Sequence, residues 1–217
     1  MNSVLITGTD TGIGKSFITY NLALALRKRG VKVGCFKPVE TFVEDIPQDG
    51  KLLSEATGQD IGEVVPITFR LPLAPRSAEI EENREVDIEF LKERFNDLKR
   101  KYEFLLVEGA GGIAVPIKKN YTYGNFALEL DLPVIIVGKA GLGTINHTYL
   151  AWFYAKSLGV EVTGIVLNRF SGRDVSERTN PLIIEEMTGV KPVVVREHAG
   201  TRISPSEEEE LLKLVGF

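Results

Sequence analysis

The feature that most constrains this chain is a glycine-rich turn close to its start. Residues 8–16 read GTDTGIGKS, directly after the apolar run 4–7 and directly before a helical pattern that begins at Lys15. Glycines allow backbone N–H groups to close around phosphate oxygens, and the N-terminus of the following helix adds a partial positive charge. The turn therefore predicts a phosphate-binding loop between a strand and a helix, in a protein that binds a nucleotide.

Two side chains of this loop carry the expected chemistry. Lys15 is placed to reach the β- and γ-phosphates of the nucleotide, and the Ser16 hydroxyl is placed to ligate Mg²⁺. Five residues separate Gly8 from Gly14, one more than the usual spacing. The alternative is a glycine-rich turn whose Gly-Lys-Ser is incidental, and the flanking strand and helix favour the nucleotide.

Short apolar runs alternate with helical patterns along the rest of the chain. The runs have the length and the continuous hydrophobicity of buried parallel strands. They cover residues 4–7, 31–36, 104–107, 134–137, 162–167 and 193–195. We therefore expect an α/β fold with a P-loop NTPase-like, doubly wound, mainly parallel sheet flanked by helices, in a single domain over residues 1–217.

The helical patterns carry recognisable start signals. They cover residues 15–29 and 144–158, a stripe of Leu91, Phe95, Leu98 and Tyr102 that Asp87 could cap, and a segment that opens with Ser204-Pro205-Ser206-Glu207. The stretch 41–85 contains four of the chain's prolines and is the least regular part of the sequence. Long irregular segments are usually functional loops, so this stretch is a candidate for substrate-side structure.

Composition excludes several classes of protein. Lys and Arg total 26 against 30 Asp and Glu, a net charge of -4, so no basic excess indicates a nucleic-acid partner. The only cysteine, Cys35, excludes an intrachain disulfide and suggests a reducing compartment. No apolar run approaches the ~20 residues of a membrane span, and the N-terminus does not resemble a signal peptide. We expect a cytoplasmic protein with no membrane partner.

Polar residues follow two further strands. Lys37 and Pro38 come directly after the run 31–36, where a lysine can neutralise charge on a transferring phosphoryl group. Glu108 comes directly after the run 104–107 and precedes a glycine-rich loop, which indicates a carboxylate that faces a metal. Asp49 is a plausible second carboxylate, although its position is equally typical of a residue that caps a helix.

Two later segments are weaker candidates. Residues 141–147 read GLGTINH and open a helix, whose free N–H groups suit an anion such as a carboxylate. Asn168 ends the run 162–167 and could hydrogen-bond a purine edge, but an asparagine there is also an ordinary turn residue.

Four blocks of this sequence together resemble the dethiobiotin synthetases, the ATP-dependent carboxylase–cyclases of biotin synthesis. They are GTDTGIGKS at residues 8–16, KPV at 37–39, VEGAGG at 107–112 and LGTINH at 142–147, in the order of that family. The longer phosphate loop is itself the form found in the family. The resemblance implies a homodimer that uses ATP, Mg²⁺ and CO₂ to close a ureido ring on 7,8-diaminononanoate. A carbamate and a carbamic-phosphoric mixed anhydride are the implied intermediates.

The resemblance also implies roles for individual residues. The catalytic residues would be Lys37, Lys15 and Thr11, and the Mg²⁺ ligands would be Ser16, Asp49 and Glu108. The nucleotide-binding residues would be Gly12, Ile13, Gly14, Lys15, Ser16, Phe17, Asp49, Glu108, Gly109, Ala110, Gly111 and Asn168. The substrate-binding residues would be Thr11, Lys37, Thr41, Leu142, Gly143, Thr144 and Asn146. The loop of the last four would bind the substrate carboxylate across the dimer interface.

The sequence departs from the family pattern near the nucleotide. Gly12 stands where several relatives carry Glu, and Arg169 stands where Asp is common. Residues 196–198 read REH, in place of the proline-containing segment that usually packs on the base. The preference for ATP over other nucleotides is therefore left open.

Two other classes share parts of this pattern. Partitioning ATPases, which act as dimerisation switches, carry an additional lysine five positions before the loop lysine, where this chain has Asp10. Amidating synthetases of the cobyrinate type need a further glutaminase domain with a nucleophilic cysteine, and Cys35 lies inside an expected strand. The residues therefore favour a dethiobiotin synthetase-like enzyme, with a partitioning-type ATPase as the alternative.

Overall fold

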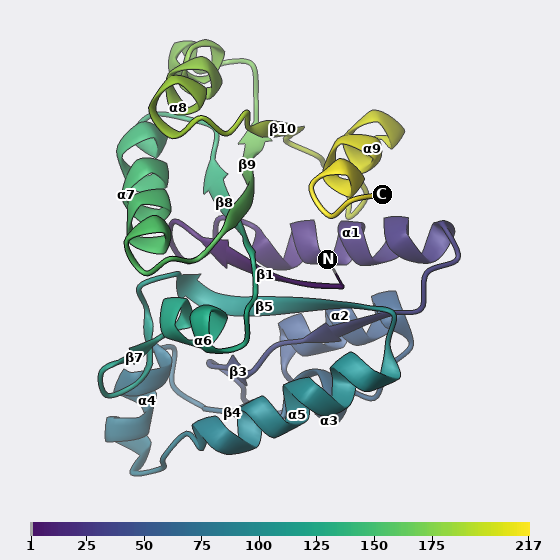
Figure 1. Cartoon of the computed structure of the whole chain (residues 1–217), viewed down its shortest axis with the longest axis vertical. Helices are drawn as coiled ribbons and strands as arrows, with labels where there is room; N and C mark the ends of the chain where they lie inside the picture. Colours follow the sequence, from purple (N-terminus) through teal and green to yellow (C-terminus); the bar gives the residue numbers. More distant parts are fainter. Residues whose placement is uncertain (1) are drawn as a thin grey trace.

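The computed structural model describes residues 2–217 and shows a parallel sheet between two layers of helices (Figure 1). The six strands of the sheet lie in the order β10-β9-β8-β1-β5-β2, and all of their pairings are parallel. They are β1 (Ser3–Gly8), β2 (Val33–Phe36), β5 (Phe104–Gly112), β8 (Val134–Lys139), β9 (Val162–Phe170) and β10 (Val193–Arg196). The predicted doubly wound parallel sheet is confirmed.

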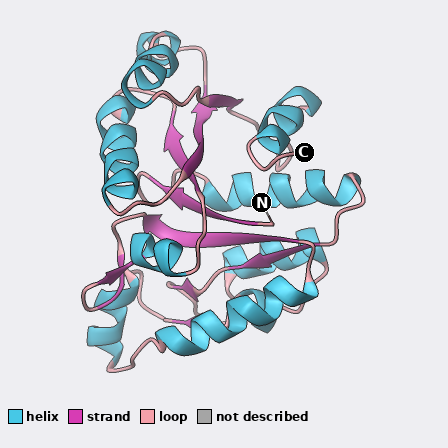
Figure 2. Cartoon of the chain, viewed as in Figure 1, coloured by secondary structure: helices cyan, strands magenta, loops and turns pink. Residues whose placement is uncertain are grey.

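Each face of the sheet is covered by its own set of helices, because neighbouring strand residues point to opposite faces (Figure 2). Val4 and Ile6 belong to one apolar cluster, and Leu5 belongs to the other. The first cluster includes residues of α1 (Lys15–Lys28), α2 (Gln48–Thr57), α3 (Ile61–Val64) and α9 (Pro205–Lys213). The second includes residues of α4 (Pro75–Glu82), α5 (Ile88–Lys101), α6 (Tyr123–Glu129), α7 (Thr144–Ser157) and α8 (Asn180–Thr188).

The order of the strands places the phosphate loop at the centre of one sheet edge. β1 pairs with β5 on one side and with β8 on the other. β2 and β5 therefore lie on one side of β1, and the later strands β8, β9 and β10 are added on its opposite side. Ligands of open α/β sheets bind at such a switch point, outside the carboxyl ends of the strands. The loop after β1 and the residue after β2 both lie at this edge.

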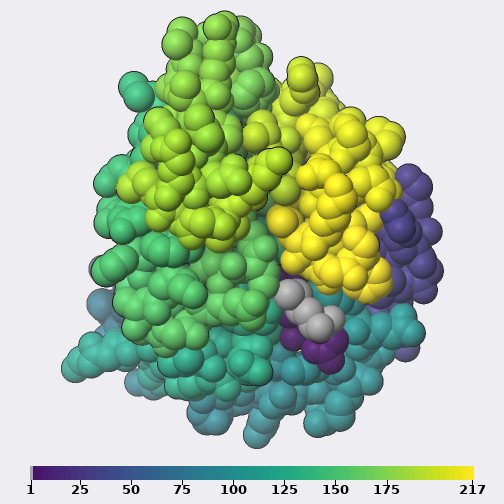
Figure 3. All heavy atoms as spheres, turned by 45° about the horizontal axis from the view of Figure 1, so that its top comes forward, coloured from purple at the N-terminus to yellow at the C-terminus, as the bar shows by residue number. Residues whose placement is uncertain are grey.

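The helix caps predicted from the sequence are present in the structure. Asp87 accepts a hydrogen bond from the backbone N–H of Phe90 at 3.0 Å and caps α5, whose stripe of Leu91, Phe95 and Leu98 is buried. Tyr102 of the same stripe lies one residue beyond the end of the helix. Ser204 and Glu207 form a reciprocal capping box at the start of α9, which packs against α1 (Figure 3).

The stretch 41–85 is more regular than its sequence suggests, because about half of it is helical, and it lines the cavity described below with Thr41, Asp49 and Leu73. It contains α2, α3 and α4, and the two-residue strand β4 (Ile67–Thr68), which pairs with β3 (Val39–Glu40). Pro47 and Pro75 begin helices rather than interrupt them, since a proline at a helix start removes no intrahelical hydrogen bond. The expected strand end at 107 was also wrong: β5 continues to Gly112, so Glu108 lies within the strand.

The remaining elements are short. They are the antiparallel pair β6 (Pro116–Lys118) and β7 (Tyr121–Thr122), and the 3₁₀ turn η1 (Val175–Arg178). Among residues 2–217, no helix combines the length and the apolar character that crossing a bilayer requires.

Candidate active site

A cavity of about 580 Å³ opens at the carboxyl edge of the sheet, over the phosphate loop. It brings together residues from the loop after β1, from the ends of β2 and β5, and from α2. The predicted site residues among its lining are Thr11, Gly12, Gly14, Lys15, Ser16, Lys37, Thr41, Asp49, Ala110 and Gly111. Segments that lie far apart in the sequence therefore meet in one pocket.

A buried ion pair lies at the base of this cavity. The Lys37 ammonium is 2.7 Å from Oε1 of Glu108 and 2.9 Å from Oδ2 of Asp49. The Ser16 hydroxyl donates a hydrogen bond of 2.8 Å to the same Oε1 of Glu108. Both Lys37 and Glu108 are buried, while Asp49 is partly open to solvent. Lys37 follows directly after β2, and Asp49 lies in the first turn of α2.

The neighbouring carboxylates keep Lys37 charged. Burial alone would lower the pKa of the Lys37 ammonium, but Glu108 and then Asp49 outweigh this effect and raise it above its ordinary value. Burial alone would raise the pKa of Asp49, but Lys37 lowers it below its ordinary value. The two groups therefore form an ion pair over the whole physiological range of pH.

Lys15 has a different environment. Its ammonium donates a hydrogen bond of 3.1 Å to the backbone carbonyl of Asp10, at the start of the loop. Burial lowers the pKa of Lys15 to about 8, against the opposing effect of Glu108. An anion beside this ammonium would favour its charged form, which is the role expected of a phosphate-loop lysine.

Glycines of the loop are required by its conformation and by its neighbours. Gly12 and Gly14 have positive φ angles of 69° and 94°, which side chains rarely adopt. A Cβ atom at Gly14 would also overlap the side-chain amide of Asn168. That amide donates a hydrogen bond of 2.9 Å to the carbonyl of Ile13, so Asn168 supports the loop from the end of β9.

The oxygens around Lys37 suit a hard divalent cation. Oε2 of Glu108 is buried and lacks a hydrogen-bond partner, and the Ser16 hydroxyl and the Asp49 carboxylate lie beside the same lysine. Within residues 2–217, no group of three or more Asp, Glu, His or Cys side chains could hold a metal by itself. Two carboxylates and a hydroxyl nevertheless fit Mg²⁺, which takes few protein ligands and completes its shell with phosphates and water.

Glu40 is a buried residue of the site that the sequence analysis missed. Its carboxylate accepts hydrogen bonds from the backbone N–H groups of Asp49 at 3.0 Å and Gly50 at 2.8 Å. It thus anchors the first turn of α2 and positions Asp49. Burial raises the pKa of Glu40. No sequence pattern marks this residue, because its partners lie nine and ten positions away across a loop.

Arg169, Phe42 and Leu73 also line the cavity, and the sequence analysis assigned none of them to the site. Arg169 has a positive φ of 60°, and its backbone N–H donates to the side-chain oxygen of Asn168. Positive φ angles in non-glycine residues leave no dependable trace in a single sequence.

The loop before α7 does not reach this cavity within the chain. Leu142 is 89% exposed, and Gly143 and Asn146 are also exposed. Thr144 is buried, and its hydroxyl lies 3.2 Å from that of Thr148. The four predicted substrate residues of this loop are therefore separate from Lys37 and Thr41 in the isolated chain.

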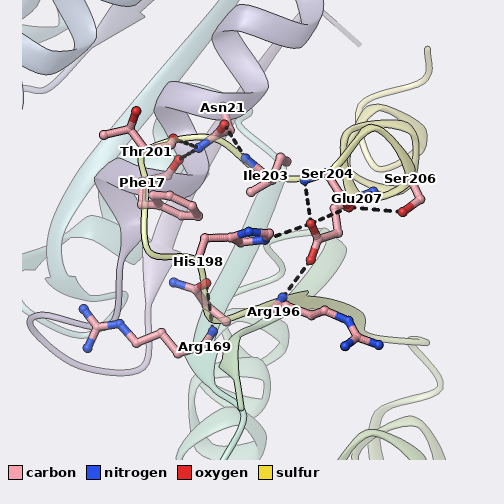
Figure 4. Close-up of polar contacts among 11 residues, drawn as sticks. Phe17, Asn21, Arg169, Arg196, His198, Thr201, Ile203, Ser204, Ser206 and Glu207 are labelled. Atoms are coloured by element: carbon pink, nitrogen blue, oxygen red, sulfur yellow. Dashed lines mark hydrogen bonds and ion pairs between the residues drawn. The ribbon is translucent and has the colours of Figure 1, made fainter. Parts of the chain in front are cut away.

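The segment that follows β10 is held by side chains rather than by prolines (Figure 4). His198 lies 2.9 Å from Glu207, and its ring stacks on Phe17 of α1 with 6.3 Å between ring centroids. Asn21 donates to the carbonyl of Thr201 and accepts from the N–H of Ile203. These bonds fix residues 196–204 beside the first turns of α1, close to the phosphate loop.

Comparisons with known proteins agree with this geometry. A family model described as "AAA domain" matches residues 2–196. Two solved structures share the fold at low sequence identity. The MinD cell division protein of Aquifex aeolicus has a TM-score of 0.61 at 16% identity, over 100% of this chain and 98% of its own. The MinC:MinD complex of the same organism has a TM-score of 0.58 at 17% identity, over 92% of this chain and 83% of that one.

The fold, the phosphate loop and the AAA-domain match define a P-loop nucleotide-binding protein. Three curated relatives, each named "ATP-dependent dethiobiotin synthetase BioD", narrow this class. The protein from Aquifex aeolicus is 66% identical over 88% of this chain and 87% of its own. Those from Bacillus licheniformis and Methanococcus vannielii are 43% and 42% identical, over 88% and 76% of this chain and 83% and 78% of their own. The chain belongs to the dethiobiotin synthetase family.

This membership confirms the predicted enzyme, an ATP-dependent cyclo-ligase of biotin biosynthesis. The likeness to MinD, at 16% identity, shows the fold alone. No observation therefore favours the alternative of a partitioning-type ATPase.

Proposed function

We propose that this protein closes the ureido ring of dethiobiotin from 7,8-diaminononanoate and CO₂, with ATP and Mg²⁺. The observation that carries the proposal is the Lys37 ammonium, held between Glu108 and Asp49 beside the phosphate loop. This arrangement supplies fixed positive charge where a phosphoryl group would be transferred. Phosphoryl transfer needs positioning and charge neutralisation more than a protein nucleophile.

The proposed reaction has three steps. One substrate amine attacks CO₂ and loses a proton, which gives a carbamate. A carbamate oxygen then attacks the γ-phosphorus of ATP and displaces ADP, which gives a carbamic-phosphoric mixed anhydride. The second amine attacks the carbonyl carbon of the anhydride and expels inorganic phosphate, and its proton passes to solvent. The products are dethiobiotin, ADP and phosphate.

In this reaction the charged groups of the cavity have separate tasks. Lys37 stabilises negative charge on the carbamate and on the phosphoryl group in transit. Lys15 binds the β- and γ-phosphates, and the Thr11 hydroxyl contacts the γ-phosphate and the carbamate. Thr41 hydrogen-bonds the substrate amine, since it lies on the wall of the cavity that also carries Lys37.

Ser16, Asp49 and Glu108 would hold Mg²⁺. Bound there, the ion would neutralise charge on the β- and γ-phosphates. The unpartnered Oε2 of Glu108 supports this role, because a polar oxygen that is buried without a partner is costly. Glu40 contributes indirectly, since it holds the N-terminus of α2 and with it Asp49.

The rest of the nucleotide would follow the loop towards β9. The backbone of Gly12, Ile13 and Gly14 would enclose the phosphates, with Phe17 beside the nucleoside. Glu108, Gly109, Ala110 and Gly111 would line the other side. Asn168 would meet the adenine, since its amide still has a second N–H after the bond to Ile13.

We also propose that the enzyme acts as a homodimer in the cytoplasm. Asn146, Leu150 and Phe153 fall on one face of α7, and Leu150 and Phe153 are each 55% exposed. An exposed apolar face of this kind suits a second copy of the chain. The neighbouring loop of Leu142, Gly143, Thr144 and Asn146 would then bind the substrate carboxylate in the partner's site, at the N-terminus of α7.

The direct test is a product assay. Protein, 7,8-diaminononanoate, labelled bicarbonate and ATP are mixed with and without Mg²⁺, and dethiobiotin and ADP are quantified. We expect labelled dethiobiotin and ADP in equal amounts, and only with Mg²⁺ present. Bound ATP without any product, under conditions where the diamino acid is saturating, would contradict the proposed function.

A further inference from the structure

Phe42 has a backbone conformation that a phenylalanine rarely adopts. Its φ angle is 64°, in the left-handed region, and its side chain is 64% exposed. A bulky residue in this region is strained, whereas glycine would adopt it freely. An exposed ring buries little apolar surface, so packing within the chain does not explain why a phenylalanine occupies this position.

The surrounding backbone holds Phe42 in this conformation. Its N–H donates to the carbonyl of Leu71 at 3.1 Å, and the N–H of Val43 donates to the carbonyl of Phe69 at 3.0 Å. The segment after β3 is thereby tied to the segment after β4 on both sides of the strained residue. Strain that the surrounding structure enforces is often found at functional sites.

Phe42 lies at the candidate active site. It follows Thr41 directly, and both residues line the cavity together with Leu73. The side chain of Leu73 is 37% exposed, so it also presents apolar surface to solvent. These two side chains make an apolar part of the cavity wall, whereas Lys15, Lys37 and Asp49 make its charged part.

The substrate of the proposed function also has charged and apolar parts, like the wall of the cavity. 7,8-Diaminononanoate carries two amines at one end and a carboxylate at the other, with a run of methylene groups between them. An amine at Thr41 and Lys37 would place the nearest methylenes beside Phe42, the next residue along the chain. Apolar contacts would then discriminate between substrates of different chain length.

We propose that Phe42 is a specificity-determining residue: its ring, with Leu73, covers the methylene chain of the diamino acid and selects for chain length. The inference rests on the proposed function, because it requires the diamino acid as substrate. It gives a role to the strained and exposed aromatic side chain beside Thr41.

The test is Phe42→Gly, which relieves the strained backbone and removes the ring. We expect an unchanged or higher melting temperature. We also expect KM for 7,8-diaminononanoate to rise about 10- to 100-fold, and the preference over diamino acids with a shorter chain to fall by a similar factor. ATP affinity stays the same. Phe42→Leu, which keeps an apolar side chain, retains part of the preference.

Asp131→Gly is the matched control. Asp131 also has a positive φ, of 51°, and it does not line this cavity. The Asp131→Gly variant should have an unchanged or higher melting temperature, with no change in KM or chain-length preference. The contrast separates relief of strain from loss of the ring.

Three results would overturn the inference. The first is a wild-type enzyme that makes dethiobiotin and a Phe42→Gly variant with the same KM and the same chain-length preference. The second is a variant that dissociates into monomers and recovers wild-type KM at high protein concentration, which would make Phe42 an interface residue. The third is a wild-type protein that makes no dethiobiotin, in which case the proposed function fails as well.

Discussion

Two regions that the family resemblance assigns to one active site are built differently. Around the phosphate loop, Lys37 and Glu108 are buried and paired within the chain. In the loop before α7, Leu142 is 89% exposed and makes no part of the cavity. The first region is completed when the chain folds. The second presents its apolar side chains and a helix N-terminus to solvent in the isolated chain.

The difference follows from the free energy of burying charge. An unpaired charge in the interior is strongly destabilising, so the buried Lys37 needs its contacts with Glu108 and Asp49 within the folded chain. Exposed apolar side chains such as Leu150 and Phe153 destabilise the folded chain far less than a buried unpaired charge does, so they are tolerated in the isolated chain. Folding of the chain thus fixes the charged groups of the first region, whereas under the proposed function the second region would bind the substrate carboxylate only after the chains assemble.

The largest expected effect comes from breaking the first region. Lys37→Ala should lower turnover by about 10²–10³-fold, or ~3–4 kcal/mol, because it removes a positively charged hydrogen-bond donor from a desolvated site. It should also destabilise the fold by about 3–5 kcal/mol, since Glu108 is left buried without its partner. Turnover and thermal unfolding measure the two effects.

The double variant Lys37→Ala with Glu108→Gln separates stability from catalysis. Removing the unpaired carboxylate charge should restore much of the stability but none of the turnover. If turnover recovered with stability, or if Lys37→Ala retained wild-type turnover, the catalytic lysine would lie elsewhere.

A negative charge introduced at the start of α7 tests whether the second region binds the substrate carboxylate. Thr144 is buried and bonded to Thr148, so the exposed Asn146 is the better position for a new carboxylate. Asn146→Asp should raise KM for the diamino acid about 10-fold or more, because like charges would meet at the carboxylate site. ATP binding should survive. Asn146→Ser serves as the neutral control, and an equal KM in both variants would show that this helix start binds no carboxylate.

Mixing two variants tests whether one active site takes Lys37 from one chain and Asn146 from the other. In a composite site, a heterodimer of Lys37→Ala and Asn146→Asp chains contains one site with both native residues. Equal mixing makes half of the dimers heterodimers, so about a quarter of wild-type activity should return at low substrate. If each chain used its own loop, the mixture would equal the mean of its parents.

A graded effect is expected from the proton on Lys15. Its pKa of about 8 in the free protein should rise when phosphates bind, because anions favour the charged form. ATP affinity should therefore fall above pH 8, by up to about tenfold per pH unit. Lys37 stays charged over this range, since its pKa is raised. Calorimetry from pH 7 to pH 9.5 would measure the slope.

Lys15→Arg is the control for this titration, because an arginine remains charged at every pH in that range. Its affinity for ATP should not vary with pH through this group. A wild-type affinity that is equally flat would show that Lys15 is already charged at pH 9 without the nucleotide.

Local sequence patterns located the six strands of the main sheet, the phosphate loop and the helix caps at Asp87 and Ser204. These features depend on neighbouring residues: a continuous apolar run, a glycine that adopts positive φ, a side chain that caps the next turn. Lys37 was found in the same way, since the end of one strand is a local property.

Contacts between residues that are distant in the sequence became visible in the fold alone. Glu40 anchors the helix that carries Asp49, Asn168 supports the phosphate loop from β9, and Phe42 is held in a strained conformation by the segment after β4. The stretch 41–85 contains three helices, and the loop before α7 lies away from the cavity. Such contacts depend on how crossover connections return to the sheet, and local periodicity carries no information about them.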